Sequence, residues 1–218
     1  LVAKGYLSEA ILNYILLLGW SPKGEQEIFS LEEMVKIFDP AGISKSPAIF
    51  DTVKLRAINA EYIRRLPAEE FYRLAEPWID QAVHTPLDKK ALCAVLQPRC
   101  EVLEDIPPQL DFFDEMPEYE VSLYANKKQK TTPETALQAL QALEPVLEGL
   151  TEWNKDAIFG AASAKAAEMG VKNGWMLYPL GIALSGKNRT PGGGTELAAI
   201  MGKEKTLARV KQAIQKLS

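Results

Sequence analysis

Residues 7–19 read Leu-Ser-Glu-Ala-Ile-Leu-Asn-Tyr-Ile-Leu-Leu-Leu-Gly, and the spacing of their apolar side chains decides the fold class. Four apolar side chains recur at steps of three and four residues, the period of one helix face: Leu7, Ile11, Ile15 and Leu18. Ser8 is predicted to cap this helix at its start, and Gly19 to close it. The stretch therefore predicts an amphipathic helix, and most of the chain repeats the pattern.

The same helical period recurs outward from this stretch. Ser30-Leu31-Glu32-Glu33 has the form of a capping box, in which the side chains of Ser30 and Glu33 each accept a hydrogen bond from the other's backbone N–H. Further helices are predicted at residues 51–66, 68–78 and 87–96, after Thr132, and after Gly202. These segments leave little room for any other kind of regular structure.

Prolines and caps fix several helix ends. Pro98 has no backbone N–H, so it should kink or end the helix at 87–96 and leave Arg99 at a helix break. Pro145 should disturb the helix that begins at Thr132, and Thr195 can cap the helix that follows it. Residues 175–183 are ambiguous, and no long alternation of polar and apolar residues predicts a strand. The predicted fold class is all-α.

The composition excludes several classes of protein. With 218 residues, of which 47% are hydrophobic and 25% charged, the chain is typical of a folded globular protein. Its longest apolar run is too short to cross a bilayer, so no membrane partner is predicted. One histidine and two cysteines cannot supply the four ligands of a structural zinc site, and so few cysteines without an export signal favour the cytoplasm. Because the chain opens at Leu1 without an initiator methionine, we expect a piece of a longer protein.

The net charge of −4 conceals an asymmetry along the chain. Residues 1–150 hold 15 basic and 24 acidic residues, whereas residues 151–218 hold 10 basic and 5 acidic residues. A basic segment of this kind favours a polyanionic partner, although basic faces are also ordinary on soluble helices. By contrast, residues 101–120 hold eight acidic residues and no basic one, and they are predicted to form a solvated acidic connector.

No pattern typical of catalysis stands out. The chain has no Gly-rich phosphate loop after a strand and no nucleophile elbow, and His84 is the only histidine that could act as a base. We therefore predict no catalytic, cofactor-binding or metal-binding residue in it. The most unusual segment is 187–196, whose glycines would let backbone amides approach a ligand beside Lys187 and Arg189. An ordinary turn followed by a helix cap is the alternative.

Three stretches of the sequence belong together. The first stretch runs from Gly5-Tyr6-Leu7-Ser8-Glu9-Ala10 to Gly19-Trp20-Ser21-Pro22. The second runs from Phe38-Asp39 through Ile43-Ser44-Lys45-Ser46-Pro47 to Tyr62-Ile63. The third runs from Pro179-Leu180 through Ser185-Gly186 and Thr190-Pro191-Gly192 to Leu207. In residues, order and spacing they resemble the carboxy-terminal half of bacterial glutamyl-tRNA synthetase. Together they span nearly the whole chain.

The resemblance implies an all-helical half that binds tRNA and is not itself catalytic. Residues 1–66 would be a stem-contact region, and residues 67–145 and 146–218 two helical subdomains that bind the anticodon. The partner would be tRNA(Glu), bound by a monomer. ATP and Mg²⁺ would act in a catalytic domain that lies before Leu1, with no cofactor bound by this fragment.

The resemblance also assigns roles to residues near the helix break. Gln97-Pro98-Arg99 aligns with a family box in which an arginine faces the third anticodon base. Glutamate anticodons end in cytosine, whose pairing edge offers two acceptors to the paired donors of a guanidinium, whereas the edge of guanine presents donors. Arg99 would therefore favour cytosine. The alternative is a surface arginine that pairs with Glu101 or Asp105.

The remaining assignments concern one loop and a set of basic side chains. Thr190, Pro191 and Gly192, with the neighbouring Gly193, match the loop that touches the first two anticodon bases in the family. The residues expected to meet the tRNA backbone are Lys187, Arg189, Lys45, Lys54, Arg56, Arg64 and Arg65. For each of the last five, ordinary solvation on a helix surface is an equal alternative. The rival for the whole chain is an all-helical protein-interaction module.

Overall fold

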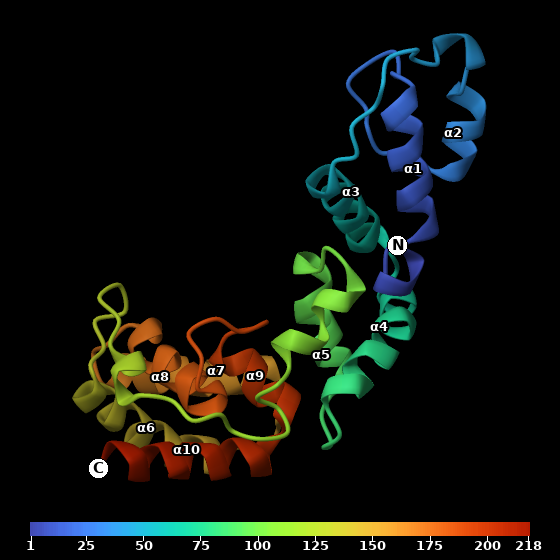
Figure 1. Ribbon diagram of the computed structural model, residues 1–218. Helices are drawn as coiled ribbons and strands as arrows, with labels where there is room; N and C mark the ends of the chain where they lie inside the picture. Colours follow the sequence, from blue (N-terminus) through green and yellow to red (C-terminus); the bar gives the residue numbers. More distant parts are fainter. The chain divides into compact units, whose positions relative to one another are not determined.

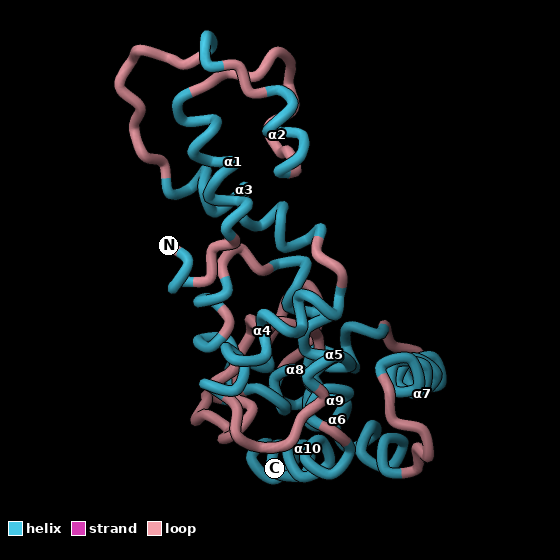
Figure 2. The backbone as a smooth tube through the Cα atoms, turned by 90° about the vertical axis from the view of Figure 1, so that its right-hand side faces the viewer, coloured by secondary structure: helices cyan, strands magenta, loops and turns pink.

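The computed structural model covers residues 1–218, and its regular structure is helical throughout, with no β-strand (Figure 2). The α-helices are α1 (Ser8–Gly19), α2 (Leu31–Ile37), α3 (Thr52–Arg65), α4 (Ala68–Ala82), α5 (Lys89–Leu96), α6 (Pro133–Glu148), α7 (Lys155–Glu168), α8 (Asn173–Ser185), α9 (Gly194–Met201) and α10 (Lys203–Leu217). Short 3-10 helices include η1 (Val2–Lys4), η3 (Gln97–Arg99) and η6 (Val121–Tyr124). The predicted all-α class is confirmed. None of the α-helices combines the length and the apolar composition that a membrane span requires.

The chain folds into two compact units, each formed by two separate segments of the sequence. Unit 1 consists of Leu1–Trp78 and Leu96–Pro107, and unit 2 consists of Ile79–Val95 and Pro108–Ser218. Two of the three boundaries between the units fall within α4 and α5, which Figure 1 labels, and the third lies between Pro107 and Pro108. The division at residues 66 and 145 stays a prediction.

Unit 1 is organised around the contact between α1 and α3. Its core cluster joins residues far apart in the sequence: Tyr6, Ala10, Tyr14, Leu55, Ile58 and Val102. The side chain of Asn59 is fully buried in this unit, where its Oδ1 accepts from the N–H of Leu7 at 2.8 Å and its Nδ2 donates to the carbonyl of Glu101 at 2.6 Å. A buried amide needs such partners, and these bonds tie three segments together.

The helix ends of unit 1 agree with the sequence pattern at α2 and differ at α1. Both hydrogen bonds of the predicted capping box between Ser30 and Glu33 are present. Ser8, however, is the first residue of α1 and not its cap, so that prediction is wrong. Leu7 occupies the cap position and offers no side-chain acceptor, and its own N–H is satisfied by Asn59 instead.

Unit 2 packs α10 against α6, and α8 against both α6 and α9. The buried side chains of α6 are Ala136, Ala139, Leu140, Leu143 and Leu147. Pro145 lies inside α6, which continues to Glu148. Thr195 is a buried residue of α9, and the N-cap is Gly193, so the prediction that Thr195 caps this helix is wrong.

The segment 101–120 is not the solvated connector that its acidic residues predicted. Val102, Leu110, Phe112 and Phe113 are fully buried, and the two phenylalanine rings stack with their centroids 4.4 Å apart. The prediction failed because it counted charges, whereas apolar side chains between the acidic residues supply the packing. The acidic residues are exposed or half-buried, and the segment contributes apolar side chains to both units, Val102 to unit 1 and the two phenylalanines to unit 2.

Candidate nucleic-acid interface

Arg99 lies at the end of a short turn that unit 1 holds in place. The α-helix α5 ends at Leu96, and Gln97–Arg99 form the 3-10 turn η3, as the position of Pro98 predicted. The side-chain Nε2 of Gln97 donates to the carbonyl oxygens of Ile63, at 3.0 Å, and Leu66, at 2.9 Å. Gln97 is thus an anchor that joins η3 to the end of α3, and both N–H groups of its amide are used inside the protein.

The guanidinium of Arg99 is exposed and has no partner within the protein. The alternative that it pairs with Glu101 or Asp105 is wrong, because both carboxylates bind Arg56 instead. The Nε of Arg56 lies 2.8 Å from Glu101 Oε2, and its Nη2 contacts Asp105. Burial alone would lower the pKa of Arg56, but hydrogen bonds to the two carboxylates outweigh it and raise that pKa. Because Arg56 pairs with the carboxylates of Glu101 and Asp105, these carboxylates do not pair with Arg99.

The loop between α8 and α9 is held in shape by bonds within itself. Thr190 Oγ1 donates to the carbonyl of Gly192 at 2.6 Å, and the N–H of Gly193 donates to Glu196 Oε1 at 3.4 Å. Pro191 and Gly192 are buried, whereas Gly193 is exposed. Of the four predicted anticodon residues in this loop, therefore, only Gly193 is exposed, and Thr190 is half-buried.

The start of the same loop is equally fixed. Gly186 ends α8 with a φ of +65°, a conformation that glycine adopts without strain. Ser185 Oγ donates to the carbonyl of Gly181 at 2.7 Å and accepts from the N–H of Lys187 at 3.1 Å. Lys187 Nζ lies 2.5 Å from Asp111 Oδ1, which engages its charge inside unit 2, whereas Arg189 is exposed and unpartnered.

The basic residues predicted for the tRNA backbone in unit 1 divide into two groups. Three are paired with carboxylates: Lys54 with Glu27 at 3.0 Å, Arg64 with Glu61, and Arg56 with its two acidic partners. Lys45 and Arg65 are exposed and have no partner. Exposed ion pairs are weak, so the three paired side chains could exchange partners, but only Lys45 and Arg65 are free without that exchange.

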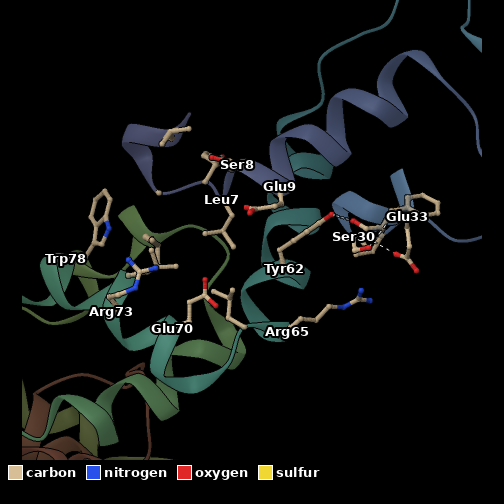
Figure 3. A pocket seen from close by; sticks show the side chains of 18 residues that line it. Leu7, Ser8, Glu9, Ser30, Glu33, Tyr62, Arg65, Glu70, Arg73 and Trp78 are labelled. Carbon is tan, nitrogen blue, oxygen red and sulfur yellow. Dashed lines mark hydrogen bonds between the residues drawn. The ribbon is translucent and has the colours of Figure 1, made fainter. Parts of the chain in front are cut away.

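Arg65 lies at a pocket of about 750 Å³ in unit 1 (Figure 3). Glu9, Glu33 and Glu70 line this pocket together with Arg65 and Arg73. Tyr62 stays neutral there, since burial raises its pKa to about 12. Three carboxylates against two guanidinium groups do not favour a phosphate, so the pocket adds nothing to an RNA interface.

The predicted anticodon residues fall into both units. Gln97 and Arg99 belong to unit 1, and Thr190, Pro191, Gly192 and Gly193 belong to unit 2. The sequence did not show that Gln97 is an anchor or that Asp111 engages Lys187, because both depend on contacts between distant segments. Lys127, Lys128 and Lys130 were not among the predicted RNA contacts, although three lysines so closely spaced are a signal of positive charge in the sequence. No group of three His, Cys, Asp or Glu side chains is placed to hold a metal ion.

Two protein-family models match this chain. A family model described as an anticodon binding domain matches residues 70–214, and one described as the catalytic domain of class I tRNA synthetases (E and Q) matches residues 1–57. The latter match includes most of the predicted stem-contact region.

Among curated proteins, the whole chain is 47% identical to the glutamate-tRNA ligase of Clostridium acetobutylicum over 218 residues, and 48% identical to that of Clostridium botulinum strain Hall over 217 residues. The chain spans 45% of the length of each. It corresponds to their carboxy-terminal part.

Two solved structures have the same fold. A crystal structure of a glutamate tRNA ligase from Elizabethkingia meningosepticum, in complex with its amino acid, is 28% identical with a TM-score of 0.83. The match covers 98% of this chain and 42% of that one. A glutamate-tRNA synthetase from Elizabethkingia anophelis is 26% identical, with a TM-score of 0.81 and coverage of 97% and 41%.

Proposed function

This chain belongs to the anticodon-binding domain family, and from that premise we propose that it is the tRNA-binding, anticodon-recognising part of a glutamate-tRNA ligase. The partner is tRNA(Glu), bound by a single copy of the chain in the cytoplasm. The whole ligase joins glutamate to its tRNA, and the ATP and Mg²⁺ of that reaction are bound by its catalytic domain. Arg99, Arg189 and the loop at 187–193 bind RNA and take no part in that chemistry.

The exposure of Arg99 is the observation that carries this proposal. The guanidinium of Arg99 is free of the neighbouring carboxylates, and the turn that carries it is anchored, so little backbone freedom is lost when Arg99 meets a base. Its paired N–H donors match the two acceptors of cytosine and meet the donors of guanine. Arg99 thereby favours an anticodon that ends in cytosine through both attraction and repulsion.

The loop of unit 2 supplies a different kind of contact. The hydroxyl of Thr190 donates to Gly192 but can still accept a hydrogen bond from a base, and the exposed Gly193 lets a base approach the loop closely. Because internal hydrogen bonds already fix the shape of the loop, RNA binding costs little conformational entropy there. Arg189 beside the loop is free to meet a phosphate.

A titration with two transcripts tests the role of Arg99. The RNAs are tRNA(Glu) and the same tRNA with guanine as the third anticodon base, and the proteins are wild type and Arg99→Gln. We expect wild type to bind the cytosine form about 5- to 150-fold more tightly, since a bidentate contact is worth roughly 1–3 kcal/mol of discrimination. The substitution should remove most of that preference in filter binding.

Arg189→Gln is the matched control, because Arg189 is also exposed and unpartnered and the substitution is the same. It should weaken both RNAs about equally, keep the preference, and flatten the dependence of affinity on salt. Equal weakening of both RNAs by Arg99→Gln would contradict base recognition. A wild-type affinity that hardly changes with salt would instead favour the protein-interaction module.

A further inference from the structure

A hairpin in unit 2 carries three lysines in four residues. It follows η6 and closes at the antiparallel bridge between Asn126 and Thr131, which exchange backbone hydrogen bonds of 3.0 and 3.1 Å. The side chains of Lys127, Lys128 and Lys130 are exposed. Four loop residues therefore hold three positive charges at the tip of the hairpin.

The hairpin is rigid for a surface loop. The N–H of Lys130 donates to the carbonyl of Lys127 at 3.3 Å, and the N–H of Gln129 donates to Asn126 Oδ1 at 3.0 Å. Thr131 Oγ1 is buried and donates to the carbonyl of Tyr124 at 2.7 Å. The backbone that carries the lysines is thus fixed before any ligand arrives, which lowers the entropic cost of binding.

The hairpin rests on the start of α8. A Cβ added to Gly174 would lie 1.7 Å from Gln129 Oε1, so the amide of Gln129 packs directly on the Gly174 backbone. Lys172, two residues earlier, is exposed and comes directly before α8. It adds a fourth positive charge to the group, which we call the hairpin cluster: Lys127, Lys128, Lys130 and Lys172.

None of these four side chains has a partner within the protein. Other cations of unit 2 are engaged: Lys187 by Asp111, Lys203 by the carbonyls of Glu148 and Leu150, Arg209 by three carbonyls, and Lys216 by the ring of Tyr119. Outside the hairpin cluster, only Lys155 and Arg189 in this unit are also free. Free positive charge in unit 2 is therefore concentrated at one place.

The hairpin cluster and the loop at 187–193 lie at the two ends of α8. The loop follows the last residue of the helix, and the hairpin packs on its first turn. A helix of 13 residues is about 20 Å long at 1.5 Å per residue. A nucleic acid presents a charge to such a surface every few ångströms, so one RNA segment is long enough to reach both ends.

We propose that the hairpin cluster is a second RNA contact, which binds the phosphodiester backbone while the loop at the other end of α8 meets the anticodon bases. This inference rests on the proposed function. Lysine suits the task, since a flexible ammonium group binds phosphate as a point charge without reading sequence. The cluster contributes affinity and salt dependence but no choice between anticodons.

The test is a filter-binding titration of the full chain with tRNA(Glu) at 50 and 200 mM salt. The variant is the triple substitution Lys127→Gln, Lys128→Gln and Lys130→Gln, which keeps the side-chain length and leaves the buried bonds of the hairpin untouched. Each lost phosphate contact reduces the slope of log affinity against log salt by about 0.7–0.9. We expect the ratio of wild-type affinity to variant affinity to be about 20- to 40-fold smaller at 200 mM salt than at 50 mM salt.

A matched triple variant controls for net charge. Lys23, Lys36 and Lys155 are exposed and unpartnered, and their replacement by glutamine removes the same three charges. This variant should keep nearly the wild-type slope. If the two triple variants give the same slope, the hairpin cluster is not an RNA contact and the inference is overturned.

The two proposals fail in different ways. A wild-type chain that binds RNA with no preference for the third anticodon base contradicts the proposed function. A wild-type chain that keeps this preference, together with a hairpin variant of unchanged affinity and slope, contradicts only the hairpin contact. The preference for cytosine over guanine should be the same in wild type and in the hairpin variant.

Discussion

Asp114 is a single side chain that organises the end of α4. Its carboxylate accepts from the N–H of His84 at 2.9 Å and from the N–H and hydroxyl of Thr85 at 2.9 and 2.8 Å. Burial alone would raise the pKa of Asp114, but these hydrogen bonds outweigh it and hold that pKa well below its ordinary value. The ionised form is therefore the one that stabilises the folded protein.

Replacing Asp114 by asparagine should expose this dependence on charge. A carboxyl whose pKa falls on folding stabilises the protein above its unfolded pKa of about 3.9, and that stability is lost as the pH falls toward the folded pKa. We expect Asp114→Asn to lower the free energy of unfolding by about 1–3 kcal/mol at pH 7. In urea unfolding the difference from wild type should narrow steadily from pH 5 to pH 2. A difference that does not change with pH would show that shape, and not charge, matters here.

Single residues were predictable where the signal is local. Pro98 showed that Arg99 would lie at a helix break, and the structure confirms that position. The pairing of Arg56 with Glu101 joins residues 45 positions apart, and that of His84 with Asp114 joins residues 30 apart. No local pattern announces such pairs, because the chain must fold before the partners meet. The freedom of Arg99 could for this reason not be predicted from its neighbours.

At the scale of elements, the contact between α8 and α9 depends on the absence of a side chain. A Cβ added to Gly194 would lie 2.8 Å from the carbonyl oxygen of Leu177 and 2.9 Å from the N of Gly181. Both are backbone atoms of α8, which cannot move aside as a flexible side chain would. The first residue of α9 must therefore be glycine for the two helices to approach this closely.

Gly194→Ala should separate the two helices and loosen the loop between them. We expect the free energy of unfolding to fall by about 1–3 kcal/mol, the usual cost of overpacking, when it is measured by urea unfolding. Gly193→Ala is the control, since the nearest heavy atom to its added Cβ is 3.9 Å away and its φ of −75° suits alanine. Equal losses for the two variants would argue against close packing as the reason for Gly194.

Elements were predictable where one face is apolar and the other polar. The existence of α1 and α3 was predicted from the period of their apolar residues, and that of α2 from its capping box. The predicted apolar face of α1 is only partly buried, since Ile15 is 56% exposed. In α8, by contrast, apolar residues surround the helix, so no stripe marks it and residues 175–183 seemed ambiguous. The helix α7 is rich in alanine and buries only Ile158, Ala162 and Ala166, a signal too weak for the period to stand out.

For the whole molecule, the all-α class followed from composition and period, but the division into units did not. Two of the three boundaries fall inside α-helices, in α4 between Trp78 and Ile79 and in α5 between Val95 and Leu96, and the third lies between Pro107 and Pro108. Linkers are recognised in a sequence by turns, glycines and polar runs, and a boundary within a continuous helix offers none of these. Only the contacts of the folded chain assign residues 96–107 to unit 1.

This assignment predicts how truncated chains behave. Val102 is fully buried in the core cluster of unit 1 with Leu55 and Ile58, and the carbonyl of Glu101 satisfies Asn59. A chain that ends at residue 95 lacks both contacts, at a cost of about 3 kcal/mol for the lost apolar packing and the unsatisfied buried amide. Amide hydrogen exchange at Leu55 and Ile58 should accordingly be about a hundredfold faster than in a chain that ends at residue 107. Both truncated chains retain residues 79–95 without the rest of unit 2, so equal exchange in the two would mean that unit 1 is complete without residues 96–107.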